Sequence, residues 1–223
     1  MTPPRLLPDF SRRVRVRELM DDPACDHRRL LLTIRKFAFL NRLVSSYRSV
    51  LTRWVVDDMA SRADRAYRVA DLGAGACDIP VWLLQEAARR SLRVEVMAIE
   101  ANQLIAADAR RRHGATAGLR IVCRDALDVG ALGDIDYVVG NHFLHHLSDA
   151  QISNLLTGLA GLPLRRFIFL DLLRSPWAYC LHSLVAPLIF PGTFIAEDGR
   201  RSIRSGFVLP ELTDLIAVLG LEE

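Results

Sequence analysis

Short, mainly apolar stretches alternate with longer amphipathic segments from about residue 67 onwards. The apolar stretches are bounded by turn residues, as is typical of strands buried on both faces, and lie at 67–72, 94–99, 119–123, 135–140 and 166–171. The amphipathic segments predict helices at 79–90, 102–113 and 149–160. This order predicts an α/β fold with a parallel sheet covered by helices on both faces. Such sheets bind ligands beyond the carboxyl ends of their strands.

The region 1–62 precedes this alternation and has a helical, arginine-rich pattern. It predicts a short helix at 13–20, a second helix capped by Asp26, and a third at 47–59. We predict that this region forms a lid or substrate cap, and that 63–223 is the cofactor-binding domain. Two alternatives are a plain helical layer packed on the sheet, and an arginine face that binds a membrane surface or a partner.

Composition narrows the class of protein. The chain has 223 residues, of which 51% are hydrophobic, and a net charge of +3, which gives no bulk attraction to nucleic acid. The 4 cysteines lack metal-binding spacing, and the first residues do not resemble a signal peptide, so we predict a reducing, cytoplasmic location. The most apolar run, 177–190, is shorter than the roughly 20 residues of a membrane-spanning helix. It predicts a covering helix or one wall of an apolar pocket.

A glycine turn follows the first predicted strand. Gly73 and Gly75 let the backbone approach a ligand, and the helix after them presents free N–H groups and a partial positive charge. A dinucleotide-binding turn would have a third glycine where Asp78 stands. A carboxylate there repels a pyrophosphate but attracts the amino group of a methionine moiety, which favours S-adenosylmethionine (SAM) over NAD. The plainer alternative is a tight turn without a ligand.

Polar residues at later strand ends are further candidates. Glu100 ends the second strand, where a carboxylate accepts hydrogen bonds from ribose hydroxyls, although it can also be an ordinary solvated acid. His142, His145 and His146 follow the fourth strand, and each is a candidate general base near neutral pH. A structural or substrate-shaping role is the alternative. Neighbouring histidines on an α-helix point about 100° apart, so we predict no metal site at His145 and His146.

The run D-L-G-x-G-x-x-D at 71–78, followed by I-P, resembles motif I of class I SAM-dependent methyltransferases. The resemblance implies a Rossmann-like sheet, with residues after strand four beside both cofactor and substrate. It also implies that Asp125 meets the adenine amino group and that Ala126 offers its backbone, whereas a capping aspartate is the alternative for Asp125. The predicted cofactor-binding residues are Asp71, Gly73, Ala74, Gly75, Asp78, Glu100, Ala101, Asp125, Ala126 and Asn141.

Other segments are similar to a bacterial subgroup of methyltransferases often encoded beside type III polyketide synthases, and these segments are 18–23, 41–43, 143–149 and 196–207. That subgroup is thought to O-methylate phenolic lipids of the alkylresorcinol kind and is related to quinone-biosynthesis methyltransferases. The resemblance implies a small apolar or aromatic acceptor in secondary metabolism. We predict that Phe143 shapes the acceptor site. Arg174, Arg200 or Arg204 would meet a carboxylate or phenolate, unless they are surface residues.

Two features depart from the family pattern. Cys77 stands where many relatives have a small residue, and the sequence stops at Glu223, where relatives continue into a strand hairpin. Without that hairpin the fifth strand is an edge, so either the sequence is truncated there or another element or a second copy in a homodimer covers the edge. The alternative functions are a SAM-binding scaffold that does not methylate and a quinone C-methyltransferase. A nucleic-acid methyltransferase is disfavoured because the Asn/Asp-Pro-Pro-Tyr signature does not follow strand four.

Overall fold

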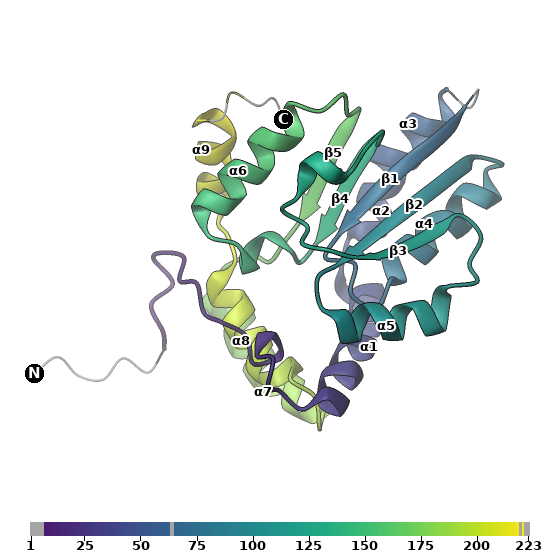
Figure 1. Cartoon of the computed structure of the whole chain (residues 1–223). Helices are drawn as coiled ribbons and strands as arrows, with labels where there is room; N and C mark the ends of the chain where they lie inside the picture. The colour runs from purple at the N-terminus through teal and green to yellow at the C-terminus, as the bar shows by residue number, and fades with distance from the viewer. Residues whose placement is uncertain (1–6, 63–64, 219, 221–223) are drawn as a thin grey trace, which may run out of the picture.

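The computed structural model describes residues 7–62, 65–218 and 220 (Figure 1). The predicted domain boundary falls beside residues 63–64, and the chain end includes 221–223, so both involve residues outside this description. The core is a 5-stranded parallel sheet in the order β3-β2-β1-β4-β5, as the α/β pattern predicts. Its strands are β1 (Ala66–Leu72), β2 (Arg93–Glu100), β3 (Leu119–Cys123), β4 (Tyr137–Asn141) and β5 (Arg166–Leu170).

The helices between the strands also match the sequence pattern, and are α4 (Asp78–Arg89), α5 (Gln103–His113) and α6 (Asp149–Ala160). Local capping fixes where two of them begin. The Asn102 side chain accepts hydrogen bonds from the first backbone N–H groups of α5, and Ser148 with Gln151 forms a capping box at α6. These caps place the loops after β2 and β4 at the carboxyl edge of the sheet.

Side chains alternate between two core clusters along the central strand β1. Tyr67 and Val69 pack on one face, against α4 and the helices that precede the sheet. Ala70 and Leu72 pack on the other face, against α6. Because both faces are covered, the strand is apolar almost throughout. Within the described residues no further strand pairs with β5, which is the outer strand on its side.

The prediction of a helix at 13–20 is wrong. This segment is extended except for a single 3-10 turn at Leu19–Asp21. Its backbone finds partners in the distant helix α8 (Ile195–Ser205) instead, since the N–H of Val14 donates to the Arg204 carbonyl and that of Val16 to the Ser205 hydroxyl. Tertiary hydrogen bonds therefore override a weak local helical pattern.

The other two N-terminal helices form near their predicted positions. The Asp26 side chain caps α1 (His27–Val44) by accepting from a backbone N–H, as predicted. The third predicted helix is interrupted, with α2 (Tyr47–Leu51) and α3 (Asp57–Ala60) joined by a π-helical turn at Thr52–Val56. Buried residues of this segment cover one face of the sheet.

The C-terminal part adds α7 (Pro176–Ile189), α8 and α9 (Leu209–Val218). The first two lie side by side near the carboxyl ends of β4 and β5, next to the N-terminal segment (Figure 1). Gly199 permits this contact, because a Cβ there would lie 2.1 Å from Nε2 of His182, and this nitrogen meets the Ile195 carbonyl at 2.9 Å. Of the helices described, none combines the length and apolar character needed to cross a membrane.

Candidate functional site

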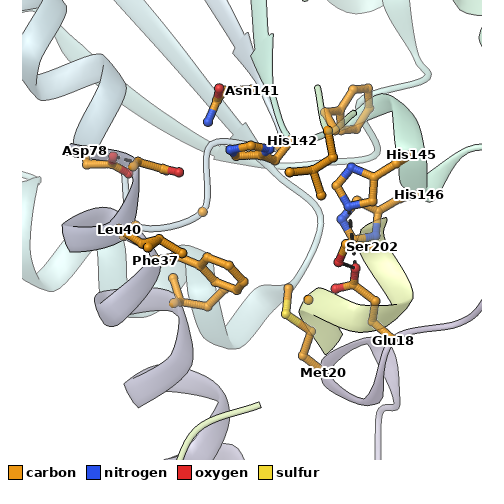
Figure 2. A pocket seen from close by; sticks show the side chains of 18 of the residues that line it. Glu18, Met20, Phe37, Leu40, Asp78, Asn141, His142, His145, His146 and Ser202 are labelled. Carbon is orange, nitrogen blue, oxygen red and sulfur yellow. Dashed lines mark hydrogen bonds and ion pairs between the residues drawn. The ribbon is translucent and has the colours of Figure 1, made fainter. Parts of the chain in front are cut away.

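A cavity of about 1080 Å³ lies at the carboxyl edge of the sheet. All ten residues predicted to bind the cofactor line it, together with His142, Phe143, His145 and His146. Figure 2 shows Asp78 and Asn141 at one side, Glu18, His145 and His146 at the other, and His142 between them. The structure therefore brings the predicted glycine turn and the residues after β4 into one cavity.

Backbone conformation explains the glycines of the turn after β1. Gly73 has φ +71° and Gly75 has φ +50°, a region that favours glycine. A Cβ on Gly73 would also lie 2.8 Å from Cδ2 of Phe143, so the turn and the loop after β4 pack closely. The Gly75 N–H donates to Oε2 of Glu100 at 3.0 Å, and the Asn102 N–H donates to Oε1 at 2.7 Å. Glu100 thus ties the end of β2 to the glycine turn.

An acidic rim, formed by Asp71, Asp78 and Glu100, faces the same end of the cavity. Burial raises the pKa of all three carboxyl groups, and the charges of Asp78 and Glu100 add to the effect at Asp71. Asn41 offsets it in part at Asp78, where its amide donates to the carboxylate at 3.4 Å. Three acids held this way favour a positively charged ligand.

Cys77 does not line the cavity. It begins α4 with φ +60°, and its fully buried side chain belongs to a small apolar cluster with Ala74, Ala98 and Ala109. Burial, together with the nearby acids, raises the pKa of its thiol to about 12, so the thiol is protonated at neutral pH. Cys77 therefore packs beneath the turn and leaves the space above it free.

The end of β4 contributes two polar side chains with unsatisfied atoms. Within the described residues, the buried Nδ2 of Asn141 and Nδ1 of His142 have no hydrogen-bond partner. Burial lowers the pKa of His142, so its ring is neutral at pH 7. His142 also has φ +54°, while its N–H donates to the Leu170 carbonyl at 2.8 Å. Unpaired buried polar groups and a strained backbone are typical of functional positions.

His145 lies in a buried ionic cluster. Its Nδ1 is 2.6 Å from Oδ1 of Asp171, just after β5, and its Nε2 is 3.5 Å from Oε1 of Glu18. Burial alone lowers the pKa of His145, but Asp171 and then Glu18 outweigh burial and raise the pKa to about 9. Burial raises the pKa of Asp171, but the charge and hydrogen bond of His145, together with the Leu172 N–H, outweigh burial and lower it. His145 therefore holds its proton at neutral pH, unlike His142.

The expected divergence of His145 and His146 is wrong. The two residues lie on a 3-10 turn (Leu144–His146), not on an α-helix. Their ring centroids are 4.2 Å apart and their planes differ by 33°. Nδ1 of His146 is 3.6 Å from Oδ2 of Asp21, so both rings face the N-terminal segment. His145 thus faces Glu18 and Asp171, whereas His146 faces Asp21.

An apolar wall closes the rest of the cavity. It comes from α1 and α7, and its side chains include Ile34, Phe37, Leu40, Leu181, Val185 and Ile189. The predicted role of 177–190 as one wall of an apolar pocket is thus confirmed. Glu18, Asp171 and Ser202 are polar cluster members without a predicted role, although Asp171 ends a predicted strand, where ligand-binding residues gather.

The three predicted substrate arginines lie outside the cavity lining. Arg174 is 4% exposed, and its guanidinium donates to the Glu211 carboxylate at 2.6 Å and 2.9 Å and to the Phe10 and Gly206 carbonyls. The backbone carbonyl of Arg204 accepts from Val14. Arg200, on the same helix, is half-buried. Arg174 joins the N-terminal segment to α9 in this arrangement.

No protein-family model and no curated protein sequence matches the chain. Solved structures do match it. Magnesium protoporphyrin IX methyltransferase from Synechocystis PCC 6803, solved with bound S-adenosylhomocysteine (SAH), is 17% identical with a TM-score of 0.55, covering 91% of this chain and 80% of that one. A SAM-dependent methyltransferase from Aquifex aeolicus is 14% identical with a TM-score of 0.55, covering 85% and 87%. The CMeT domain of the citrinin polyketide synthase is 17% identical with a TM-score of 0.52, covering 91% and 61%. The chain has the fold of these methyltransferases.

Proposed function

We propose that the protein is a SAM-dependent methyltransferase. The observation that carries the proposal is the acidic rim of Asp71, Asp78 and Glu100 around the glycine turn, at the end of a cavity large enough for cofactor and acceptor. A cationic ligand lowers the cost of ionising these buried carboxyl groups. SAM carries a sulfonium and an ammonium group, whereas the pyrophosphate of NAD would add negative charge to the same site.

The rim residues are suited to separate parts of SAM. Each oxygen of Glu100 accepts one backbone N–H, which leaves a lone pair on each for a ribose hydroxyl. Asp78, at the first residue of α4, would meet the methionine ammonium group. Asp125 and Ala126 line the cavity beyond Glu100 and would meet the adenine, although the Asp125 carboxylate also accepts from the Leu127 N–H. The unpaired amide of Asn141 is available to the cofactor or the acceptor.

The acceptor is proposed to be a small phenolic, polyketide or lipid-type molecule. The apolar wall from α1 and α7 supports this class, because it would pack against an aromatic ring or an alkyl tail. The resemblance to the subgroup encoded beside type III polyketide synthases makes a resorcinolic lipid the first acceptor to test. A cytoplasmic location and a homodimer remain predictions.

O-methylation needs the acceptor hydroxyl to lose a proton. SAM supplies an activated methyl group, so that a C–O bond forms as the C–S bond breaks and SAH leaves. We assign to His142 the role of accepting the hydroxyl proton. Its imidazole is neutral and can take up a proton, whereas the ion-paired His145 already holds one. His142 lies between Asp78 on one side of the cavity and His145 and His146 on the other (Figure 2), and Phe143 fixes the loop against Gly73. The chain's main contribution is alignment and exclusion of water.

The experiment measures SAM and SAH binding by calorimetry, then label transfer from methyl-labelled SAM to resorcinolic lipids, hydroxyquinones and RNA. Binding followed by O-methyl product from a phenolic lipid is the expected result. Product on a quinone ring carbon would favour the C-methyltransferase. Binding without turnover would favour the SAM-binding scaffold. Absence of SAM binding would refute the proposal.

A further inference from the structure

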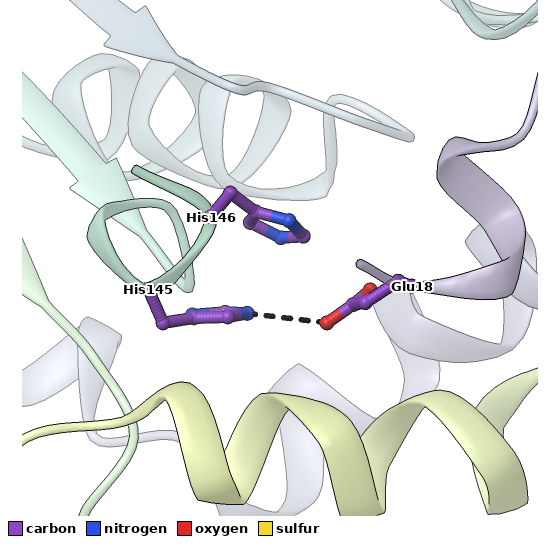
Figure 3. A group of neighbouring side chains, drawn as sticks. All are labelled: Glu18, His145 and His146. Carbon is purple, nitrogen blue, oxygen red and sulfur yellow. Dashed lines mark ion pairs between the residues drawn. The ribbon is translucent and has the colours of Figure 1, made fainter. Parts of the chain in front are cut away.

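Glu18, His145 and His146 form a cluster at the wall of the cavity (Figure 3). Each offers one atom that can bind a metal, and these atoms lie within 4.8 Å of one another. Glu18 and His145 are buried, whereas the His146 side chain is 28% exposed. The carboxylate comes from the N-terminal segment and both imidazoles from the turn after β4. The cluster thus joins two segments far apart in the sequence.

The atoms are close to metal-binding spacing. Nitrogen and oxygen ligands of tetrahedral Zn²⁺ are roughly 3.3 Å apart, given bond lengths of about 2.0–2.1 Å. Oε1 of Glu18 and Nε2 of His145 are already 3.5 Å apart. The His146 ring lies beside the His145 ring, with centroids 4.2 Å apart, and its ligand atom is within 4.8 Å of the other two. Two histidines and one carboxylate are a frequent ligand set for first-row divalent metals.

Hydrogen bonds from outside the cluster orient two of its members. Asp171 holds Nδ1 of His145 at 2.6 Å and also accepts from the His145 backbone N–H at 3.1 Å, which fixes the ring with Nε2 towards Glu18. Metal-binding histidines commonly have a carboxylate on the second ring nitrogen, as here. The Ser202 hydroxyl donates to Oε1 of Glu18. Glu18 and His145 are therefore preorganised.

Charge also favours a cation at this point. The carboxylates of Glu18, Asp21 and Asp171 all approach the two imidazoles, at 3.5 Å, 3.6 Å and 2.6 Å. Three carboxylates carry more negative charge than two imidazoles can balance, and excess charge in a buried place is costly unless it is compensated. A divalent cation bound by three of these groups compensates it.

We propose that Glu18, His145 and His146 bind a first-row divalent cation of the Zn²⁺ class. Three protein ligands leave a coordination position open, and all three line the cavity, so this position faces the acceptor. There the cation would hold an acceptor oxygen and stabilise its anionic form. That role rests on the proposed function, whereas the metal site itself does not. Asp171 acts as a positioning residue.

The experiment titrates Co²⁺ and Zn²⁺ into chelator-treated protein that carries no histidine tag. One equivalent is expected to bind, with a visible Co²⁺ absorption band that Zn²⁺ abolishes. Glu18→Gln and His146→Gln should each weaken binding at least tenfold, and Asp171→Asn roughly 10–100-fold. His27→Gln, at an exposed position on α1, is the matched control and should bind as the unaltered protein does. Circular dichroism melting checks that each variant is folded, and the partly exposed His146 provides a variant with little effect on the core.

SAM binding, measured on the same samples by calorimetry, separates this proposal from the proposed function. If SAM binds but Co²⁺ and Zn²⁺ do not, the cluster is a buried ion pair that fastens the N-terminal segment, and the metal proposal is overturned. Equal metal binding in the folded Glu18 and His146 variants also overturns it. If metal binds and SAM does not, the site stands and the methyltransferase proposal fails.

Discussion

The backbone N–H of Gly75 donates a hydrogen bond of 3.0 Å to Oε2 of Glu100. Glu100 ends β2 and Gly75 belongs to the turn after β1, so this bond joins the two neighbouring strand ends that flank the cavity. Glu100 also accepts from Asn102, which begins α5. One carboxylate therefore shapes the glycine turn and, in the proposed function, binds the ribose.

Replacing Glu100 by alanine should weaken SAM binding at least tenfold. Hydrogen bonds to a charged group contribute about 1.5–3 kcal/mol each, and the variant removes both the ribose contact and the support of Gly75. Calorimetry measures the dissociation constant. Glu95→Ala is the matched control, because this glutamate lies on the same strand with a side chain 68% exposed. Normal SAM affinity in the Glu100 variant would remove the ribose assignment.

Stabilisation by SAM should increase with pH. The pKa values of Asp71, Asp78 and Glu100 are raised above 3.8, 3.8 and 4.5. Such groups stabilise the ligand-free fold below their ordinary pKa, and this contribution is lost as the pH rises through the raised pKa. A cationic ligand binds best when they are ionised.

The increase in Tm at saturating SAM should therefore be larger at about pH 7.5 than at about pH 5. Comparing each sample with ligand-free protein at the same pH cancels the titration of distant groups. SAH, whose sulfur is uncharged, is the control and should show a weaker pH dependence. An equal Tm increase at both pH values would contradict the electrostatic basis of the proposal.

Gly73→Ala should destabilise the protein more than the same substitution at another glycine with a similar backbone conformation. Left-handed backbone costs a non-glycine residue about 1–2 kcal/mol, and overpacking adds about 1–3 kcal/mol. Gly73 has φ +71° and would place a Cβ 2.8 Å from Phe143, whereas Gly133 has φ +69° and nothing within 4 Å. Urea denaturation of both alanine variants isolates the steric part. Adding Phe143→Leu to Gly73→Ala should recover some stability; no recovery would show that the clash is not with Phe143.

The sheet could be predicted because each of its strands is a short apolar run between turn residues. Val69 and Ala70 face opposite core clusters, so both must be apolar, and this leaves a signal in the sequence. The glycine turn then indicated Asp78, the strand-end rule Glu100, and the resemblance to motif I Asn141, and parallel strands bring these positions to one edge of the sheet. The order of strands and turns places these residues at the cavity, and that order is visible in the sequence.

The acidic surroundings of His145 could not be predicted in this way. Glu18 contacts His145 although the two are 127 residues apart in the sequence. The contact forms because the backbone of segment 13–20 donates hydrogen bonds to α8 and does not form a helix of its own. Buried Asp198 helps to fix that path by accepting from the N–H groups of Leu19 and Met20. The local pattern near Glu18 carries no sign of these distant partners, and by itself it predicts a helix.

His142→Gln should lower kcat on a phenolic acceptor while leaving SAM affinity unchanged. A positioned general base contributes about 10²–10⁴-fold, so a loss of at least a hundredfold is expected. Acceptors of lower hydroxyl pKa should be affected less, because they need less help in losing the proton. Single-turnover kinetics with a series of substituted phenols measures this. A uniform loss across the series would indicate a positioning role for His142.

Arg174→Met should reduce stability without raising the KM for the acceptor. The Arg174 side chain is 1% exposed and pairs with Glu211 at 2.6 Å, outside the cavity lining. Removing one partner of a buried ion pair lowers the free energy of unfolding by about 3–5 kcal/mol. We expect a loss of about 3 kcal/mol or less here, because the Glu211 side chain is 35% exposed and can be hydrated once Arg174 is gone. Urea denaturation gives the stability, and steady-state kinetics well below the Tm gives KM.

Arg200→Met, at a half-buried position on α8, is the control and should change neither the stability nor KM much. A raised KM at unchanged stability would contradict this prediction. It would indicate that the Arg174 guanidinium leaves Glu211 and contacts the acceptor.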